Sequence, residues 1–159
     1  MKILPSLNYS FTTDKTPEEI YADLNSVTKS PKVEIFHRVD GEFIGKVSIS
    51  GFRIRSNIKY RNSFLPIIKG SVKAGENGSE VIIKMRMHPF VSVFLTIWLG
   101  GVFFAFFMGI LYAFVEGIFP ALPILLTTII MIAFEQILTK LAFFIPARKS
   151  VQRIRELLC

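Results

Sequence analysis

The stretch Phe90–Val115, FVSVFLTIWLGGVFFAFFMGILYAFV, decides the fold because it runs for 26 residues without one formally charged side chain. A helix that crosses about 30 Å of hydrocarbon needs about twenty predominantly apolar residues, since each residue of an α-helix rises by about 1.5 Å. The stretch exceeds that length, so we predict that it spans a membrane. The composition agrees with this prediction, because 51% of the 159 residues are hydrophobic and 16 are phenylalanine.

A second uncharged stretch, Pro120–Phe134, follows after a short connection. It reaches spanning length only if its helix continues through Glu135 and Gln136 to about Thr139 or Ile145, which places an ionisable group at membrane depth. The alternative is a pair of buried helices in a soluble protein, but the rest of this short chain has too little mass to cover two helices that are apolar all round. We therefore predict a two-helix transmembrane hairpin.

The sequence divides into three parts around this hairpin, and the predicted fold class is an α+β membrane protein. The parts are a basic, antiparallel β-rich domain with a short N-terminal helix at residues 1–89, the hairpin at 90–145 with helices at about 90–116 and 120–145, and a short C-terminal amphipathic helix at 146–159. Val151, Ile154 and Leu158 give the last helix its apolar face, since they recur at helical spacing.

Lysine and arginine residues are distributed unevenly about the hairpin. Fourteen of the 19 precede the first span, five lie from Lys140 onward, and the connection at residues 116–120 has none. By the positive-inside rule, we predict a multi-pass protein of the inner (cell) membrane with both termini in the cytoplasm. We expect no secretory signal, and the single Cys159 fits a reducing compartment because it has no partner for an internal disulfide.

The first thirty residues predict a strand followed by a helix. Leu7, Tyr9 and Phe11 alternate with polar residues, which is typical of a half-buried strand. Residues 16–19, TPEE, combine an N-cap threonine, a first-turn proline and a capping-box glutamate. The helix that they begin must end near Pro31, because the residue before proline avoids the helical region.

Strands dominate the rest of the N-terminal domain. The alternation of apolar residues changes phase at Gly51, which predicts a bulge or a tight turn there. Two further segments predict a closing β-hairpin around a turn within Ala74–Ser79. The predicted strands and the earlier turn are Val33–Val39, Asp40 with Gly41 as the turn, Pro66–Lys73 and Val81–His88.

Rows of basic residues are the first feature that could carry function. Side chains two residues apart share one face of a strand. The pattern yields two rows: Arg53, Arg55, Lys59 and Arg61 on one strand, and Lys84, Arg86 and His88 on a later one. They predict a surface that binds an anionic ligand such as a nucleotide or oligonucleotide. The alternative is a solvated sheet face near anionic lipid headgroups, which attract each juxtamembrane Lys or Arg by about 1 kcal/mol.

Small residues recur at every fourth position of the first membrane helix. They are Gly101, Ala105, Gly109, Ala113 and Gly117. Such a ladder lets another helix backbone approach closely and favours right-handed crossings. It predicts packing within the hairpin, between protomers, or both. A pore would require a homo-oligomer of about four or more chains, because two helices enclose no channel.

Glu135 and Gln136 form the third candidate feature, at a depth about level with Gly100 and Gly101 on the antiparallel helix. A carboxylate inside a membrane costs a few kcal/mol, so it should face protein or water. Lys140 is an imperfect partner, because five residues place it about 140° round the helix. Glu135 is expected either to line an aqueous path among protomers or to lie near the cytoplasmic interface and meet a basic residue of the tail.

We expect no enzymatic activity, no cofactor and no metal site. The sequence has no glycine-rich phosphate loop, no cysteine pair and no serine nucleophile motif. The two histidines, His37 and His88, lack carboxylates or cysteines at the spacing of a metal site.

The order of a basic domain and a two-helix hairpin resembles small membrane effectors of bacterial antiphage signalling, including the channel-type effector of Hailong defence. That resemblance covers the whole chain by architecture and implies an oligomeric ion channel or pore. In such effectors a nucleotide or oligonucleotide messenger acts on the cytoplasmic domain.

A second architecture is also similar to this chain. The order of strand, helix, antiparallel strands and closing helix is similar to the START-like helix-grip fold, with the membrane hairpin inserted before the final helix at Ala147–Leu158. That resemblance implies a membrane-tethered binding module without a pore, which would hold a lipid or another apolar ligand. Inward residues such as Ile54 and Ile58 would then matter in place of the basic row.

Overall fold

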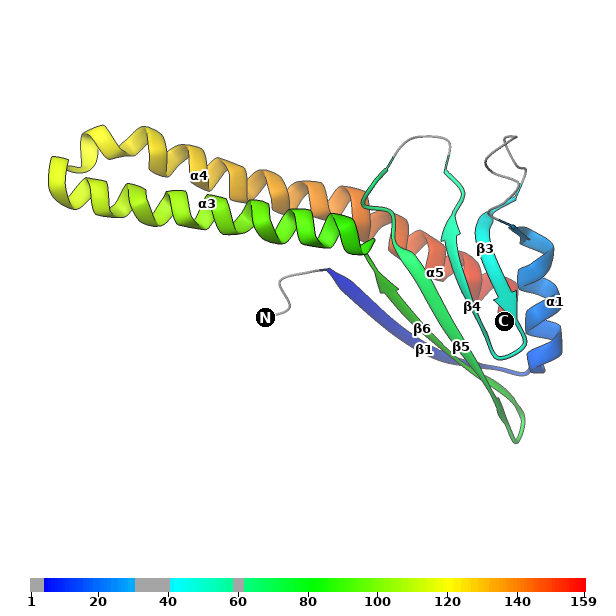
Figure 1. Cartoon of the computed structure of the whole chain (residues 1–159). Coiled ribbons are helices and arrows are strands. Elements are labelled where there is room, and N and C mark those ends of the chain that lie inside the picture. The colour runs from blue at the N-terminus through cyan, green and yellow to red at the C-terminus, as the bar shows by residue number, and fades with distance from the viewer. Residues whose placement is uncertain (1–4, 31–40, 59–61) are drawn as a thin grey trace.

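In the computed structural model, which describes residues 5–30, 41–58 and 62–159, a sheet domain lies at one end of a long helical hairpin (Figure 1). The two helices of the hairpin run side by side away from the domain, and the C-terminus returns to lie within the domain. The predicted strand Val33–Val39 and the predicted turn residue Asp40 lie outside the described residues.

Within the described residues, six strands form one sheet in the order β1-β6-β5-β4-β3-β2. The strands are β1 (Ser6–Thr13), β2 (Thr28–Lys29), β3 (Phe43–Ser48), β4 (Gly51–Ser56), β5 (Ile67–Gly75) and β6 (Gly78–Arg86). Every neighbouring pair is antiparallel except β2 and β3, which are parallel. The sheet is therefore mixed, whereas the sequence predicted an antiparallel one. The difference arises because the two-residue β2 directly continues the helix α1 (Pro17–Val27) and pairs with β3 in passing.

Local sequence signals set the first helix and the turns as predicted. The Thr16 hydroxyl accepts a hydrogen bond from the Glu19 amide at 3.3 Å, and the Glu19 carboxylate accepts one from the Thr16 amide at 2.8 Å, so the capping box is present. Gly51 pairs with Ser48 across a two-residue turn, which confirms the tight turn. β5 and β6 form the predicted hairpin around residues 76 and 77.

The hairpin helices are α3 (Pro89–Glu116) and α4 (Ile118–Thr139). Gly117 separates them with φ at +92°, a left-handed conformation that L side chains rarely adopt. α4 then continues through a π-helical turn, η1 (Lys140–Phe144), into α5 (Ile145–Leu158). Ile118–Leu158 is thus one helix of 41 residues, whereas the sequence predicted a membrane helix and a separate C-terminal helix.

Pro146 explains the irregular turn within this long helix. Proline has no amide hydrogen, so it cannot donate to the carbonyl four residues earlier, at Ala142. The Asn62 side-chain amide donates to that carbonyl at 2.8 Å, and the Asn62 oxygen accepts from the Phe64 amide at 2.9 Å. The loop after β4 therefore satisfies the helix at the point where its own hydrogen bonding is interrupted.

The hydrophobic core lies between one face of the sheet and two helices, α1 and α5. Ile20 and Leu24 of α1 pack with Ile154 and Leu158 of α5, and all four are buried. Hydrogen bonds also fix the end of α5, because the Lys15 ammonium donates to the Leu157 carbonyl at 2.7 Å. The closing helix therefore belongs to the sheet domain as well as to the hairpin.

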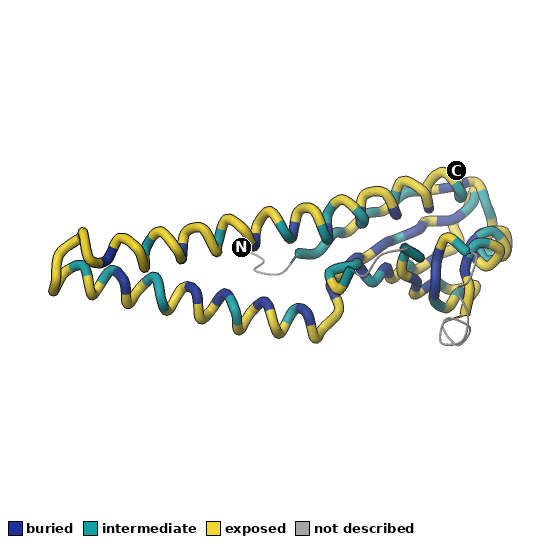
Figure 2. Tube along the Cα trace, turned by 90° about the horizontal axis from the view of Figure 1, so that it is seen from above, coloured by how far each residue is buried: buried dark blue, intermediate teal, exposed yellow. Residues whose placement is uncertain are grey.

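Neither hairpin helix is a buried core helix. In their most apolar segments only 22% of the residues of α3 and 17% of those of the continuous helix are buried. Figure 2 shows this as exposed positions along most of both helices. The exposed side chains are large and apolar, with Phe114 at 84% and Phe119 at 82% exposure. Both helices are long and apolar enough to cross a membrane.

Candidate functional site

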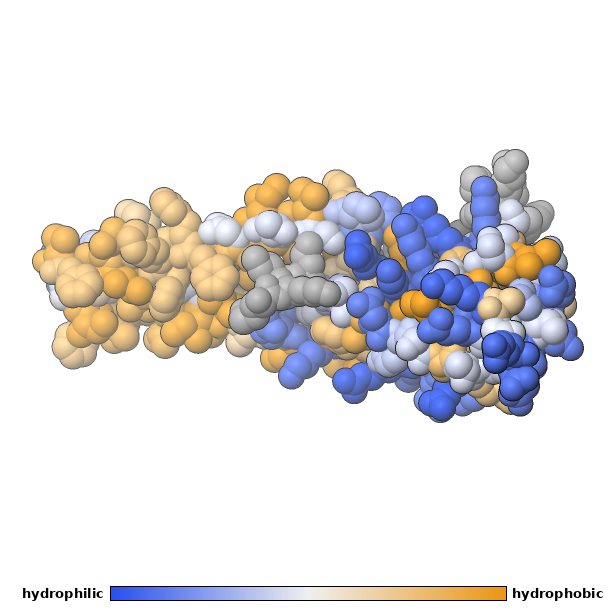
Figure 3. Space-filling view, turned by 90° about the horizontal axis from the view of Figure 1, so that it is seen from below, coloured by the Kyte–Doolittle hydropathy of each residue, from blue (hydrophilic) through white to orange (hydrophobic). Residues whose placement is uncertain are grey.

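Basic side chains gather on the face of the sheet opposite α1 and α5, which we call the outer face. Strand alternation sends Phe52 and Ile54 into the core and therefore turns Arg53 outward. The same alternation in the neighbouring strands gives the exposed basic residues of the outer face: Lys46, Arg53, Arg55, Lys69, Lys73, Lys84 and Arg86. In Figure 3, hydrophilic atoms gather over the sheet domain and hydrophobic atoms cover the hairpin.

Strand register places four of these cations in one row, which we call the basic row. Lys46 lies opposite Arg53, Arg53 opposite Lys69, and Lys69 opposite Lys84. Neighbouring strands are about 4.8 Å apart, and like charges directly opposite each other are destabilising. The basic row therefore concentrates positive charge that a bound anion would neutralise.

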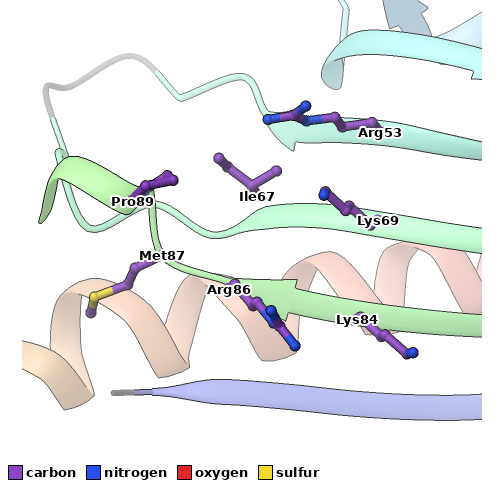
Figure 4. A pocket seen from close by; sticks show the side chains of 7 residues that line it. All are labelled: Arg53, Ile67, Lys69, Lys84, Arg86, Met87 and Pro89. Atoms are coloured by element: carbon purple, nitrogen blue, oxygen red, sulfur yellow. The ribbon is translucent and has the colours of Figure 1, made fainter. Parts of the chain in front are cut away.

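A pocket of about 330 Å³ lies over part of the basic row (Figure 4). We call it the basic pocket, and its lining residues are Arg53, Ile67, Lys69, Lys84, Arg86, Met87 and Pro89. The cations come from three neighbouring strands, and Pro89 is the first residue of the hairpin helix α3. The pocket therefore combines four cations with an apolar border on the side where the hairpin begins.

The predicted basic residues fall in three places. Arg53, Lys84 and Arg86 line the basic pocket, and Arg55 shares the outer face opposite Ile44. Lys59 and Arg61 lie outside the described residues.

The sequence analysis missed two members of the basic row, Lys46 and Lys69. Both alternate in phase with inward apolar neighbours, so the signal was present. Only the strand register could place them beside Arg53. His88 makes no part of the pocket lining and instead caps α3, with its Nδ1 accepting from the Phe90 amide at 3.3 Å.

A second hollow lies on the other side of the sheet, beside the junction of α4 and α5. We call it the junction groove; it measures about 340 Å³ and its lining residues are Glu42, Phe43, Ser56, Ile58, Leu141, Ile145, Pro146, Lys149, Ser150 and Arg153. Its apolar members come from the sheet edge and from the turn where the hairpin helix enters the domain. Its polar members are Lys149, Ser150 and Arg153 on α5, and Glu42 and Ser56 on the sheet side.

An ion pair joins the two walls of the junction groove. The Arg153 guanidinium donates to both carboxylate oxygens of Glu42, each at 2.7 Å. The hydrogen bond from Arg153, followed by its charge, lowers the pKa of Glu42. Ser56 and Ser150 add a hydroxyl pair at 2.6 Å. These contacts hold α5 against the start of β3 and the end of β4.

The Glu42–Arg153 pair predicts a small loss of stability in acid. Because the pKa of Glu42 lies below its ordinary value of 4.5 in the folded protein, the pair stabilises fully above that value and fails as pH falls through the folded pKa. Both side chains are about half exposed, so Glu42→Gln should cost at most about 1 kcal/mol at neutral pH. Unfolding of both proteins across pH tests this. A difference that stayed constant into strong acid would contradict it.

The small-residue ladder divides between two surfaces. Buried positions along α3 and α4 recur at spacings of three, four and seven, which is typical of a left-handed helix pair. Gly117 lies beyond the end of α3, so the ladder on this helix ends at Ala113. A four-residue step drifts by about 40°, so the ladder turns by about 120° from Gly101 to Ala113 and cannot face one helix throughout. Gly109 faces α4, where an added Cβ would lie 3.0 Å from Ile124 and Leu125, whereas a Cβ at Gly101 would meet nothing within 4 Å.

Glu135 is turned into the hairpin and is only 5% exposed. Its carboxylate accepts hydrogen bonds from the Thr139 hydroxyl at 2.8 Å and from the Gln136 amide at 2.9 Å. Among the residues that the structure describes, no ion pair to a basic residue of the tail is formed by this carboxylate. Two hydrogen bonds from its own helix therefore hold the carboxylate inside the hairpin, in neither of the two places that the sequence predicted for it.

Comparisons with known proteins identify no family for this chain. No protein-family profile matches this sequence, and no curated protein sequence matches it. The solution NMR structure of the Polyketide_cyc-like protein Cgl2372 from Corynebacterium glutamicum is similar to it at 14% identity and a TM-score of 0.33, over 86% of this chain and 97% of that chain. At that identity and TM-score, the likeness indicates nothing about ligand or activity.

Proposed function

We propose that this chain is a membrane-anchored binding module whose sheet domain takes up a lipid-like, largely apolar ligand at the cytoplasmic surface of the membrane. The observation that carries the proposal is the continuity of α4, η1 and α5. One helix leaves the apolar hairpin and closes the sheet, so the junction groove opens where a ligand could pass from the bilayer into the domain.

Helix length supports this position of the groove. α4 has 22 residues, which correspond to about 33 Å of rise and match the hydrocarbon thickness. The exposed Lys140 follows directly, and the groove residues Leu141 and Ile145 lie within the next turn and a half. In this topology the apolar end of the groove therefore lies at the depth of the lipid headgroups, and Lys149 lies further from the bilayer.

The distribution of charge supports the orientation. In the sequence every Lys and Arg lies outside α3 and α4, and the tip of the hairpin around Gly117 carries none. In the proposed topology both termini are cytoplasmic, and α3 and α4 form a multi-pass anchor in the cell membrane.

An oligomeric effector with a gated pore is a second candidate function. The open side of α3 at Gly101 favours it, because a helix of another protomer can approach closely there. The burial of Glu135 gives it less support, since a carboxylate within one hairpin does not line a path between protomers. A nucleotide or oligonucleotide remains the ligand predicted for that function.

The proposed function is tested by blocking the junction groove with a charge. Ile58→Glu places a carboxylate among the groove's apolar residues, and Ile49→Glu makes the same change at an exposed turn outside it. We expect Ile58→Glu to weaken binding of a fluorescent fatty acid by about tenfold or more, because it replaces an apolar contact of the ligand with a negative charge that repels the fatty-acid carboxylate. Ile49→Glu should change binding less than about twofold.

The measurement uses the full chain in neutral phosphatidylcholine nanodiscs, with fatty-acid fluorescence as the readout. Co-purified lipids, identified by mass spectrometry, give the natural ligand class. Equal binding by the wild type and Ile58→Glu would refute the groove as the site.

A further inference from the structure

We propose that the basic pocket on the outer face binds a phosphate-bearing group with several negative charges. This site is separate from the junction groove, because Lys69 and Lys84 project from the face of the sheet opposite α5. The group can be presented by a phosphorylated lipid headgroup or by a soluble polyphosphate such as a nucleotide, since both carry the same recognised chemistry.

The number of cations sets the charge of the ligand. Four cations of the described part of the chain line the pocket: Arg53, Lys69, Lys84 and Arg86. No acidic residue is among the described residues that line it. A phosphate monoester carries about two charges at neutral pH and would leave about half of this positive charge without a counter-ion. A ligand with two or more phosphate groups fits the pocket better.

Register adds a physical reason for tight anion binding. Arg53, Lys69 and Lys84 lie directly opposite one another on neighbouring strands, so they repel in the free protein. An anion that bridges them removes that repulsion and adds charge-assisted hydrogen bonds. Arginine and lysine together provide both a planar fork and compact point charges for phosphate oxygens.

The basic pocket lies beside the start of the hairpin helix α3, close to the proposed membrane surface. Arg86 is three residues before Pro89, the first residue of α3, which corresponds to about 10 Å of extended chain. Ile67, Met87 and Pro89 form the apolar border of the pocket on the hairpin side (Figure 4). A headgroup could therefore enter from the bilayer while its acyl chains stay in the membrane, and a soluble phosphate could enter from the solvent.

Two lysines on the same strand provide a matched pair of variants. Lys69 lines the pocket between Arg53 and Lys84, whereas Lys73 lies on the same face opposite Glu80 and outside the pocket. Lys69→Glu and Lys73→Glu change the net charge equally. Lys69→Glu should fold, because Lys69 is exposed and the new carboxylate would lie between two cations.

The experiment measures the protection of lysine amines from acetylation by mass spectrometry, on the full chain in nanodiscs. One arm adds inorganic tripolyphosphate to neutral phosphatidylcholine nanodiscs. The other arm replaces part of the phosphatidylcholine with a doubly phosphorylated phosphoinositide. Lys84 reports on the pocket in both variants, and Lys29, which is exposed on β2 and lines neither the basic pocket nor the junction groove, serves as an internal reference.

The expected result is selective protection of Lys84 in at least one arm. The apparent affinity for the phosphate ligand, taken from that protection, should fall about tenfold or more in Lys69→Glu and less than about twofold in Lys73→Glu. Protection in neutral nanodiscs assigns a soluble ligand, and protection only with the phosphoinositide assigns a lipid headgroup. Equal weakening by both variants would mean general charge attraction and overturn the proposal. Lack of selective protection in both arms would overturn it as well. Neither result depends on whether fatty acid binds the junction groove.

Discussion

Phe143→Ala is expected to lower the free energy of unfolding of the sheet domain by about 3–5 kcal/mol. Phe143 lies in the π-helical turn, is 0% exposed and belongs to the core formed by the sheet and α5. Its ring meets that of Phe144 edge to face, with the centroids 5.2 Å apart. Removal of the ring leaves a cavity at the point where the hairpin helix enters the domain, so the closing helix should also loosen.

The measurement is denaturant unfolding of the full chain in nanodiscs, followed by hydrogen exchange in β5 and β6. Phe134→Ala is the matched control, because it deletes the same ring from a position on α4 that is 60% exposed in the isolated chain. In the proposed membrane topology that side chain faces lipid, so its loss should cost the sheet domain little. If both substitutions destabilised the domain equally, the placement of Phe143 in the core would be wrong.

Phe143 also shows how far the sequence alone could specify this fold. The apolar positions Val151, Ile154 and Leu158 have helical spacing, so an amphipathic closing helix was predictable. The sequence analysis ended the membrane helix at residue 145 and began a separate helix at residue 146. The helix instead continues, because the carbonyl that Pro146 leaves without a donor is satisfied by Asn62. A contact between residues 80 positions apart gives no signal in a local pattern.

The candidate site, too, could be predicted only in part from the sequence. Alternation alone placed Arg53, Lys84 and Arg86 on strand faces, and the structure sets them around one pocket. Lys69 joins them only through the β4–β5 register, which depends on turn positions and core packing over the whole sheet. The junction groove could not be predicted, because it forms only when the sheet edge meets the end of the hairpin.

Gly109→Leu is expected to lower the free energy of unfolding of the hairpin by about 1–3 kcal/mol or more, because overpacking a protein core has a cost of this size. An added Cβ at Gly109 would already lie 3.0 Å from Ile124 and Leu125, so the rest of a leucine side chain must push α4 away. Unfolding by sodium dodecyl sulfate in mixed micelles measures this loss. Gly101→Leu is the control, since nothing lies within 4 Å of its Cβ. If neither substitution lowered the stability of the hairpin, Gly109 would not lie in the contact between α3 and α4.

The same two variants separate the two proposed functions through the mass of the detergent-solubilised complex. A binding module needs no contact on the open side of α3, so its mass should be unaffected by Gly101→Leu. A gated pore needs about four or more protomers, and the open face at Gly101 is where their helices can approach most closely. A discrete assembly that Gly101→Leu dissociates, with the hairpin still intact, would therefore favour the effector. A monomer in both proteins would exclude the pore, because one hairpin encloses no channel.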